Sequence, residues 1–243
     1  MIVLQGAFSE GSLLETAGQV MGSPLVSVIT PVLNRADTMR VCLRSVAHQS
    51  YSRVEHIVVD GGSTDGTVDV IRACASDGLR WISEPDHGMY DAINKGMAIA
   101  NGDIVAYLNS DDLYLPWTVS VAVEHLNSST DLVFGDLGVV HRGEHGSLES
   151  FYVQYYPEFD LQFYTYVGTL GQPTVFWRCG LSDLIGPFDR SYRLIGDCEY
   201  WLRAAKAGAS FRHIDEVMAI QVEHAATLRT TQAAQLGEEF AHQ

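Results

Sequence analysis

The chain has 243 residues, 47% of them apolar, which excludes a largely disordered protein and allows one large domain or two small ones. Its formal net charge is −15, from 30 acidic and 15 basic residues, which excludes nucleic-acid binding through a basic face. An anionic substrate would therefore need a cation as mediator. The four cysteines form no C-x-x-C pair, so we expect reduced core residues in a cytoplasmic compartment and no zinc site.

The N-terminal segment, residues 1–23, lacks the basic lead and the unbroken apolar stretch of a secretory signal. We expect it to be a flexible extension outside the fold. No apolar stretch in the sequence reaches the ~18 residues of a membrane-spanning helix. A lipid-linked substrate would therefore be reached by peripheral contact at the inner face of the membrane.

Strands and helices alternate through the first half of the chain. Runs rich in β-branched residues predict strands, and apolar residues at i, i+4 and i+7 predict helices between them. This β-α-β-α-β-α-β order with short connections is typical of an α/β fold with a mostly parallel central sheet flanked by helices. The predicted strands are 25–30, 56–60, 79–83 and 104–108, and the predicted helices lie near 37–46, 68–75 and 90–102.

Polar residues follow each of these four predicted strands. In open parallel sheets the ligand binds at the carboxyl ends of the strands. We therefore expect a site formed by residues at these ends, namely Asn34, Asp60, Glu84, Asp86, Asp111 and Asp112.

The second half is less regular. We expect it, residues 116–224, to join the first half, residues 24–115, in one domain, residues 24–224. The tail, residues 225–243, is expected to be helical. The predicted elements are helices 116–126 and 196–208 and strands 132–136, 174–178 and 211–215, with strands and long loops over 137–172.

The stretch "DGGSTDG" begins at Asp60 and resembles a phosphate-binding loop at first sight. It lacks the G-K-[ST] end of such a loop, and no G-x-G-x-x-G follows the first strand. Two interpretations of Asp60 remain open. Its carboxylate accepts hydrogen bonds from a base or a ribose, or it stabilises a turn through Asx hydrogen bonds.

The stretch "YLNSDDLYLP" places Asp111 and Asp112 directly after an apolar strand. Adjacent carboxylates repel each other and resist desolvation. One interpretation is a capped turn before the next helix. The other is a site for Mg²⁺ or Mn²⁺, which one or two carboxylates bind together with substrate phosphates.

Five motifs in order carry a resemblance to a known family: "VSVITPVLN", "VVDGGSTDGT", "EPDHGMYDAINKG", "ANGDIVAYLNSDD" and "GDCEYWLR". Over residues 24–205 the chain resembles family 2 glycosyltransferases of the GT-A fold, and most closely bacterial enzymes of polysaccharide and glycolipid synthesis. The resemblance implies inversion at the anomeric carbon, a Mn²⁺ or Mg²⁺ ion, and a nucleotide-diphosphate sugar donor, first of all a UDP-sugar. The acceptor would be a saccharide or a lipid-linked hydroxyl. Residues 24–115 would then form a nucleotide-sugar-binding half, and residues 116–224 an acceptor-binding half.

The resemblance also implies roles for single residues on the donor side. Pro31 and Asn34 would line the base and ribose region, and Asp60 would bind the base. Asp65 would order the turn. The family's D-x-G-x-Y-D-A-x-N-[KR]-G segment, which lies along the donor, is matched by Asp86, Gly88, Tyr90, Asp91 and Lys95.

Further roles implied by the resemblance concern the metal and the reaction. Asp111 would bind ribose or a metal-bound water, and Asp112 would bind the metal and the diphosphate. Asp197 would be the general base, a role that suits a carboxylate facing the acceptor hydroxyl; from its position alone, an N-cap of the following helix is the simpler interpretation. Glu199 is the alternative base. His224 is a second candidate metal ligand, although its surroundings match the family poorly.

The sequence departs from the family at Gly171, which precedes Gln172 where relatives often have a His-Gln pair. Two other functions stay open. A sugar nucleotidyltransferase would need a Gly-rich loop after the first strand, which "PVLNRADT" lacks. A regulatory module would bind nucleotide sugar or glycan without turnover.

Overall fold

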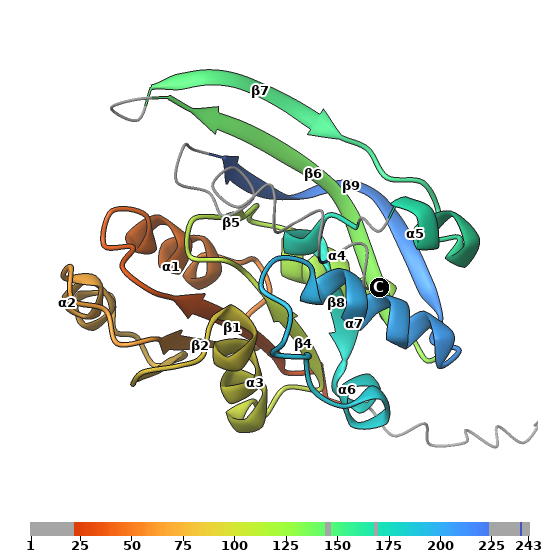
Figure 1. The fold of residues 1–243 in the computed structure, drawn as a ribbon, viewed down its shortest axis with the longest axis horizontal. Helices are drawn as coiled ribbons and strands as arrows, with labels where there is room; N and C mark the ends of the chain where they lie inside the picture. The colour runs from red at the N-terminus through yellow and green to blue at the C-terminus, as the bar shows by residue number, and fades with distance from the viewer. Residues whose placement is uncertain (1–21, 144–146, 168–169, 224–238, 240–243) are drawn as a thin grey trace, which may run out of the picture.

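The computed structural model describes residues 22–143, 147–167, 170–223 and 239. Its first half contains the predicted alternation of strands and helices, each within a few residues of its expected bounds (Figure 1). The strands are β1 (Val26–Val32), β2 (Val54–Asp60), β3 (Leu79–Ser83) and β4 (Ile104–Tyr107), and the helices are α1 (Met39–Ala47), α2 (Thr67–Ala73) and α3 (Met89–Ile99).

The second half has longer strands than the sequence predicted. The predicted strands 132–136 and 211–215 extend to β6 (Leu132–Arg142) and β9 (Phe211–Glu223). The remaining elements are β5 (Leu113–Tyr114), α4 (Thr118–His125), β7 (Leu148–Gln154), α5 (Leu161–Val167), the 3-10 turn η2 (Gln172–Thr174), β8 (Phe176–Arg178), α6 (Cys179–Ile185) and α7 (Gly196–Lys206).

All described strands belong to one sheet, in the order β3-β2-β1-β4-β8-β6-β9-β5, with β7 paired to β6. The strands of the first half pair in parallel, as predicted. The second half is mixed, because β8 pairs antiparallel with both β4 and β6 while β6 and β9 are parallel. The sheet continues across the expected boundary at residues 115 and 116, because β5 pairs with β9.

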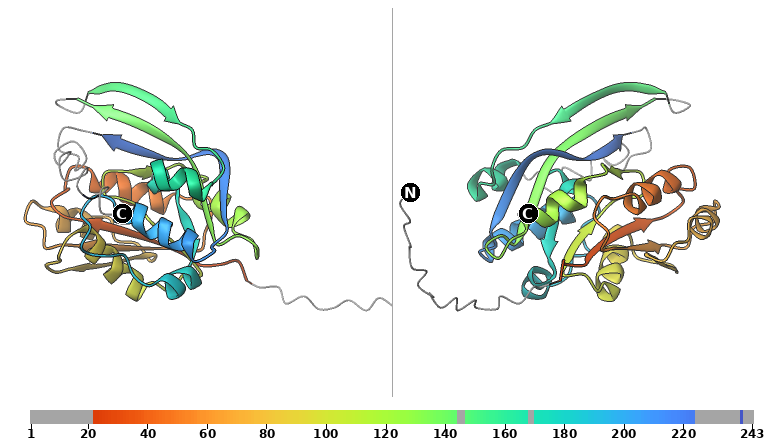
Figure 2. Two further views of the ribbon diagram at one scale, coloured as in Figure 1. Left: turned by 45° about the vertical axis from the view of Figure 1, so that its right-hand side comes forward. Right: turned by 180° about the vertical axis from the view of Figure 1, so that it is seen from behind.

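Alternate residues of the strands serve two different cores, as the pleat of a strand requires. Ile29 and Tyr107 pack with α3 and α7 on one face of the sheet. Val28 and Ala106 pack with α1 and α4 on the other face. Helix α7 lies in front of the sheet in Figure 1, and α4 lies in front of it in the reverse view of Figure 2.

Two loops at the carboxyl ends of β1 and β2 are held together by side chain to backbone hydrogen bonds. Asn34, which has a φ of 53°, accepts a bond from the Thr64 N–H at 2.9 Å. Asp65 accepts bonds from the N–H groups of Ala36 and Thr67 at 3.0 and 2.9 Å. This geometry confirms that Asp65 orders the turn.

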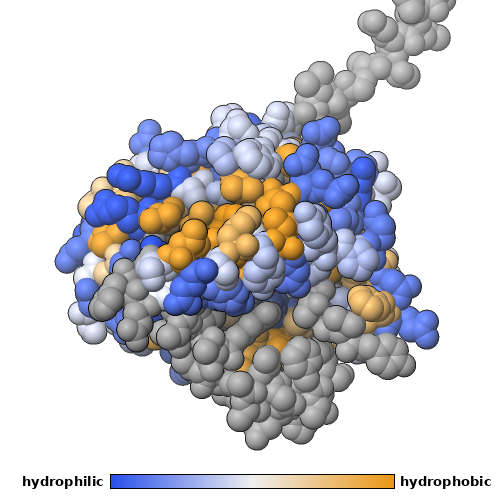
Figure 3. Space-filling model, turned by 90° about the horizontal axis from the view of Figure 1, so that it is seen from above, coloured by the Kyte–Doolittle hydropathy of each residue, from blue (hydrophilic) through white to orange (hydrophobic). Residues whose placement is uncertain are grey.

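The long strands β6, β7 and β9 form a curved arm above the rest of the sheet (Figures 1 and 2). Figure 3 looks onto this arm from above and shows apolar side chains gathered on it. Phe151 on β7 is 54% exposed. It lies over Gly138, where an added Cβ would stand 3.1 Å from its ring and 2.5 Å from Ile220 Cδ1. The absence of a side chain at Gly138 therefore lets Phe151 and Ile220 pack above the strand.

Two expectations about the whole chain can be compared with the structure. None of the four cysteines forms a disulfide, and Cys42 and Cys198 are buried. The expectation of core residues is wrong for the other two, because Cys74 is half-buried and Cys179 is exposed. Within the described ranges, no helix is both long enough and apolar enough to cross a bilayer.

His56 gives the fold a specific dependence on pH. It is buried on β2, where it is hydrogen-bonded to Thr30 Oγ1 at 2.8 Å, and burial lowers its pKa to about 3. Below about pH 6.5, His56 becomes protonated in the unfolded chain but stays neutral in the folded chain. The free energy of unfolding therefore falls as the pH falls. Between pH 7.5 and pH 5 we expect this residue to remove about 2 kcal/mol of unfolding free energy.

Urea unfolding of the wild type and of His56→Met at both pH values measures this contribution. The variant should be less sensitive to pH by the same amount, whatever its stability at pH 7.5. Parallel pH profiles for the two proteins would contradict the assignment.

Candidate active site

A pocket of about 560 Å³ opens at the carboxyl ends of β1 and β4. Its walls come from both halves of the chain: the loops after β1 and β4 and the start of α3 on one side, and β6, η2, the start of α7 and the end of β9 on the other. Eight of the residues predicted for the site line this pocket: Pro31, Asn34, Asp86, Gly88, Tyr90, Asp111, Asp112 and Asp197.

Asp60 is fully buried at the end of β2 and does not line the pocket as the structure describes it. Its Oδ2 accepts hydrogen bonds from the N–H groups of Gly62 and Ser63 and from the Ser83 hydroxyl. Its Oδ1 is buried and has no partner among the described residues. The turn interpretation therefore explains one oxygen and leaves the other without a described partner.

Asp86 and Gly88 fix the backbone directly before α3. Asp86 Oδ1 accepts a bond from the Gly88 N–H at 2.8 Å. Gly88 has a φ of 114°, which favours glycine. A Cβ there would lie 2.9 Å from the Arg193 guanidinium, so the glycine allows this cation to approach the backbone beside the pocket.

Asp91 and Lys95 were predicted to lie along the donor, but they are not among the described lining residues of the pocket. Asp91 is buried and forms an ion pair with Arg190 at 3.0 Å, and this bond lowers its pKa. Lys95 binds the Pro85 carbonyl at 3.0 Å and Glu84 at 2.8 Å. Both side chains therefore hold the segment before α3 in place, which is an indirect contribution to the pocket.

Asp112 joins the two halves of the chain. It is only 3% exposed, and its Oδ1 accepts a bond at 3.0 Å from the N–H of Val222 on β9. Its Oδ2 accepts a bond from Asn109 Nδ2 at 3.3 Å. Asn109 also donates to Gln172 Oε1 at 3.2 Å. These contacts bring the end of β4, the end of β9 and η2 together at one point of the pocket.

The two adjacent carboxylates fit a hard divalent cation of the Mg²⁺ or Mn²⁺ type, which binds to one or two carboxylates and completes its shell with phosphate and water. Both Asp111 and Asp112 line the pocket. No cluster of three or more His, Cys, Asp or Glu ligands exists among the described residues, so a substrate would have to supply the other ligands. His224 lies outside the described residues.

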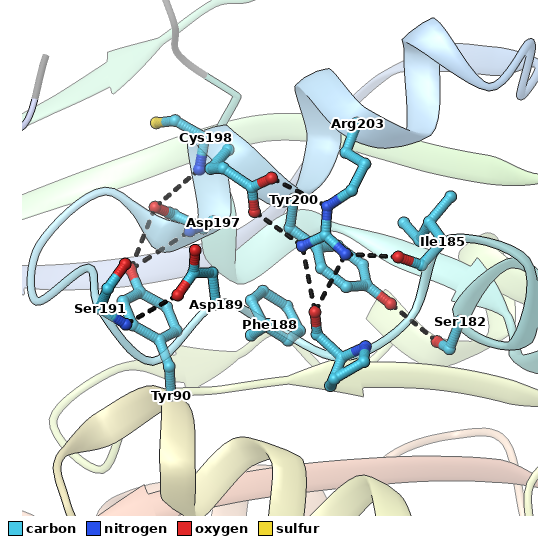
Figure 4. A network of polar contacts seen from close by, with 12 residues as sticks. Tyr90, Ser182, Ile185, Phe188, Asp189, Ser191, Asp197, Cys198, Tyr200 and Arg203 are labelled. Carbon is cyan, nitrogen blue, oxygen red and sulfur yellow. Dashed lines mark hydrogen bonds and ion pairs between the residues drawn. The ribbon is translucent and has the colours of Figure 1, made fainter. Parts of the chain in front are cut away.

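Asp197 lies in the first turn of α7, and the N-cap of this helix is Ile195. Asp197 is therefore not the N-cap of α7, and that interpretation is wrong. Its Oδ1 accepts bonds from the Cys198 N–H at 3.0 Å and from the Tyr90 hydroxyl at 3.3 Å (Figure 4). The Tyr90 oxygen in turn accepts a bond from the Asp197 N–H at 3.2 Å. An added Cβ at Gly196 would lie 2.7 Å from the Tyr90 ring, so this glycine makes room for the tyrosine.

The Tyr90 hydroxyl stays protonated at neutral pH. Burial, together with the charge of Asp197, raises the pKa of Tyr90 well above its ordinary value. The hydroxyl therefore acts as a fixed donor toward the carboxylate.

Glu199, the alternative base, has a different partner. Both of its oxygens accept bonds from the Arg203 guanidinium, at 2.8 and 2.7 Å, and Arg203 also binds the carbonyls of Ile185 and Pro187 (Figure 4). Glu199 is not among the residues that line the pocket. Its position favours a structural role for this ion pair.

Several lining residues escaped the sequence analysis. Arg193 lines the pocket beside Gly88, and its place in the loop before the "GDCEYWLR" motif is the only signal that could have indicated it. Tyr156 explains the departure at Gly171, because a Cβ there would lie 2.8 Å from the Tyr156 ring. The tyrosine therefore occupies the space that a larger residue at 171 would need.

Comparison with known proteins now identifies the family. The family model described as "Glycosyl transferase family 2" matches residues 27–175, more than half of the chain. A PGL/p-HBAD biosynthesis glycosyltransferase of Mycobacterium bovis is 33% identical over 189 residues, which are 75% of this chain and 70% of the relative. An uncharacterized glycosyltransferase of Mycobacterium tuberculosis is 45% identical over 107 residues, 43% of this chain and 41% of that protein. The chain belongs to the family 2 glycosyltransferases.

Solved structures confirm the predicted GT-A fold. Staphylococcus aureus TarS superimposes with a TM-score of 0.64 at 19% identity, over 89% of this chain and 43% of TarS. The mannosyltransferase PcManGT of Pyrobaculum calidifontis, solved with GDP-Man and Mn²⁺, has a TM-score of 0.64 at 21% identity, over 85% of this chain and 59% of its own. The chain thus spans less than two thirds of either neighbour.

The bonds between Tyr90 and Asp197 predict a measurable cost for removing one hydroxyl. Tyr90→Phe removes one of two donors to Asp197 Oδ1, which keeps the Cys198 N–H, and it removes the acceptor of the Asp197 N–H. We therefore expect the unfolding free energy to fall by about 1–3 kcal/mol. Tyr200→Phe is the matched control, because its hydroxyl makes one neutral bond to Ser182 at 2.9 Å. Urea unfolding should show the larger loss for Tyr90→Phe, and an equal or smaller loss would contradict the paired role.

Proposed function

We propose that this protein is a metal-dependent, inverting glycosyltransferase that moves a sugar from a nucleotide-diphosphate donor to a hydroxyl of a saccharide or glycolipid acceptor. The observation that carries the proposal is the single pocket lined by Asp111 and Asp112 from the first half and by Asp197 from the second. One wall suits a donor diphosphate with its cation, and the other wall suits a general base.

The donor is a nucleotide-diphosphate sugar, with a UDP-sugar as the first expectation. TarS has been solved with UDP and with UDP-GlcNAc, and PcManGT with GDP-Man, which supports a donor of this class. The buried Oδ1 of Asp60, which has no partner among the described residues, suits an N–H donor on a base such as uracil. Asn34 and Pro31 line the adjacent part of the pocket, where they would contact the base and ribose.

Asp112, with Asp111 beside it, would hold Mg²⁺ or Mn²⁺. Such an ion would supply positive charge against the diphosphate that leaves, in a chain whose own net charge is −15. PcManGT, solved with Mn²⁺, supports this assignment. The hydrogen bond from Val222 fixes the Asp112 carboxylate before any ligand binds, so little reorganisation is required.

Asp197 is the proposed general base. The acceptor oxygen attacks the anomeric carbon from the face opposite the diphosphate, and its proton passes to the carboxylate as the new C–O bond forms and the bond to the diphosphate breaks. Tyr90 and the Cys198 N–H hold Oδ1 of this carboxylate in one orientation. Configuration at the anomeric carbon is inverted because a single displacement occurs.

The acceptor side of the pocket combines apolar and aromatic groups with amides. Leu137, Tyr156 and Leu170 line it together with Gln154 and Gln221. Aromatic rings pack on the apolar faces of sugars, and amides bond to hydroxyl groups. This composition supports a saccharide or glycolipid acceptor, and by name the mycobacterial relatives act in PGL/p-HBAD biosynthesis.

The two rival functions have less support. Family 2 membership argues against a sugar nucleotidyltransferase, and no glycine occurs in the "PVLNRADT" loop after β1. A regulatory module without turnover would not need Asp197 to be held by a buried tyrosine at the pocket wall. Release of pyrophosphate from a nucleoside triphosphate would favour the first rival, and tight donor binding without turnover the second.

Thermal-shift measurements with UDP-, GDP- and dTDP-sugars, each with and without Mn²⁺, test donor and metal together. A ligand that binds only the folded state raises the melting temperature. We expect one nucleotide class to raise it, with a larger shift when Mn²⁺ is present. Asp112→Asn should abolish the part of the shift that depends on Mn²⁺.

Product analysis with the donor so identified tests the reaction. Asp197→Asn should lower the turnover of transfer by about 10²–10⁴-fold while donor binding persists. Asp69→Asn is the control, because Asp69 is exposed on α2 and pairs only with Arg72 in the described contacts. If Asp112→Asn and Asp197→Asn both keep wild-type turnover, or if the product retains the donor's anomeric configuration, the mechanism is wrong.

A further inference from the structure

A carboxylate from the far end of the chain is bound directly before α7. Glu239 Oε1 accepts a hydrogen bond from the Arg193 N–H at 2.9 Å, and Oε2 accepts bonds from the N–H groups of Leu194 and Ile195 at 3.0 and 3.1 Å. Three successive backbone N–H groups that converge on one anion form a concave binding site of the type known for oxyanions. Here a half-buried side chain of the protein itself occupies it.

These three N–H groups precede the helix, so no bond within α7 can satisfy them. Ile195 is the N-cap, and its side chain makes no capping bond. Bonds from N–H groups to a charged carboxylate are stronger than bonds to a neutral acceptor, and the N-terminal end of the helix dipole adds to the attraction. Glu239 therefore binds the N-cap N–H, as the Glu of a capping box does, and also the two N–H groups before it.

The segment bound by Glu239 contains one charged side chain of the pocket, Arg193, and directly precedes another, Asp197. Arg193 lines the pocket and donates to the His87 carbonyl at 3.3 Å, next to Gly88. Asp197 follows Ile195 by two residues and bonds through Oδ1 to Tyr90. Any shift of the bound segment would move both the cation beside α3 and the proposed base.

The charge at this place requires an explanation. The first turn of α7 already contains Asp197 and Glu199, so Glu239 brings a further carboxylate to the same helix end. Like charges at short range cost free energy, and a neutral capping residue would avoid that cost. The carboxylate, however, offers two oxygens to these three N–H groups, whereas a neutral hydroxyl or amide offers only one.

We propose that Glu239 is a positioning residue for the transfer reaction. Its carboxylate fixes Arg193, Leu194 and Ile195, and through them it sets the position of Asp197 against the substrate pocket. The inference rests on the proposed function for its catalytic consequence. The contact itself is independent of that function and has its own measurement.

Hydrogen exchange and kinetics of the full-length chain test the proposal together. In Glu239→Ala and Glu239→Gln, the peptide that contains residues 193–195 should exchange its amide hydrogens about tenfold faster than in the wild type. Turnover should fall by about tenfold, while the KM for the donor changes by less than about threefold, because geometry at the base is lost and donor contacts are kept. Glu124→Gln, at an exposed position on α4, is the control and should change neither quantity.

The melting temperature of each variant shows that it is folded, and Glu239→Gln, which keeps one acceptor oxygen, serves if the alanine variant unfolds. Unchanged exchange at residues 193–195 would overturn the contact. Faster exchange with unchanged turnover would overturn the positioning role and leave the proposed function intact. Absence of transfer by the wild type with every donor would overturn both the proposed function and the catalytic role, while the exchange measurement, which needs no substrate, would still decide the contact.

Discussion

Backbone N–H groups, rather than cationic side chains, hold the carboxylates around the pocket. Asp60 accepts bonds from the loop that follows it, and Asp86 accepts one from the start of α3. Asp112 accepts a bond from β9, and Asp197 accepts one from its own helix. The chain has twice as many acidic as basic residues, so few cationic side chains are available to pair with these carboxylates. Backbone N–H groups stabilise an anion without adding a full positive charge beside it.

This arrangement explains why the two halves of the chain form one site. The Asp112 bond to Val222 joins the loop after β4 in the first half to β9 in the second. β5 pairs with β9 at the neighbouring residues, and Gln172 donates to the Tyr107 carbonyl at 2.9 Å. Because these contacts cross between the halves beside the pocket, the two walls of the pocket are placed relative to each other by the fold itself.

The sequence predicted what depends on local pattern. Runs rich in β-branched residues indicated β1 to β4, and their order indicated that Asn34, Asp86 and Asp111 would meet at one edge. It could not indicate contacts between residues far apart, such as the bond of Tyr90 to Asp197 or the filling of the space at Gly171. Nor could it predict the length of β6 and β9, because their extensions pair with each other and, for β6, also with β7, which lies elsewhere in the chain.

Tyr90 illustrates how one side chain can serve both a motif and a distant helix. The family resemblance assigns it to the donor segment, and it does line the pocket. Yet its ring is 2% exposed and packs against Phe188, and its hydroxyl reaches the first turn of α7. A tyrosine placed in this way connects the donor-side helix α3 to the helix that carries the proposed base. Any shift of α3 would therefore reach the first turn of α7 through a single rigid ring, so the two walls of the pocket are mechanically connected.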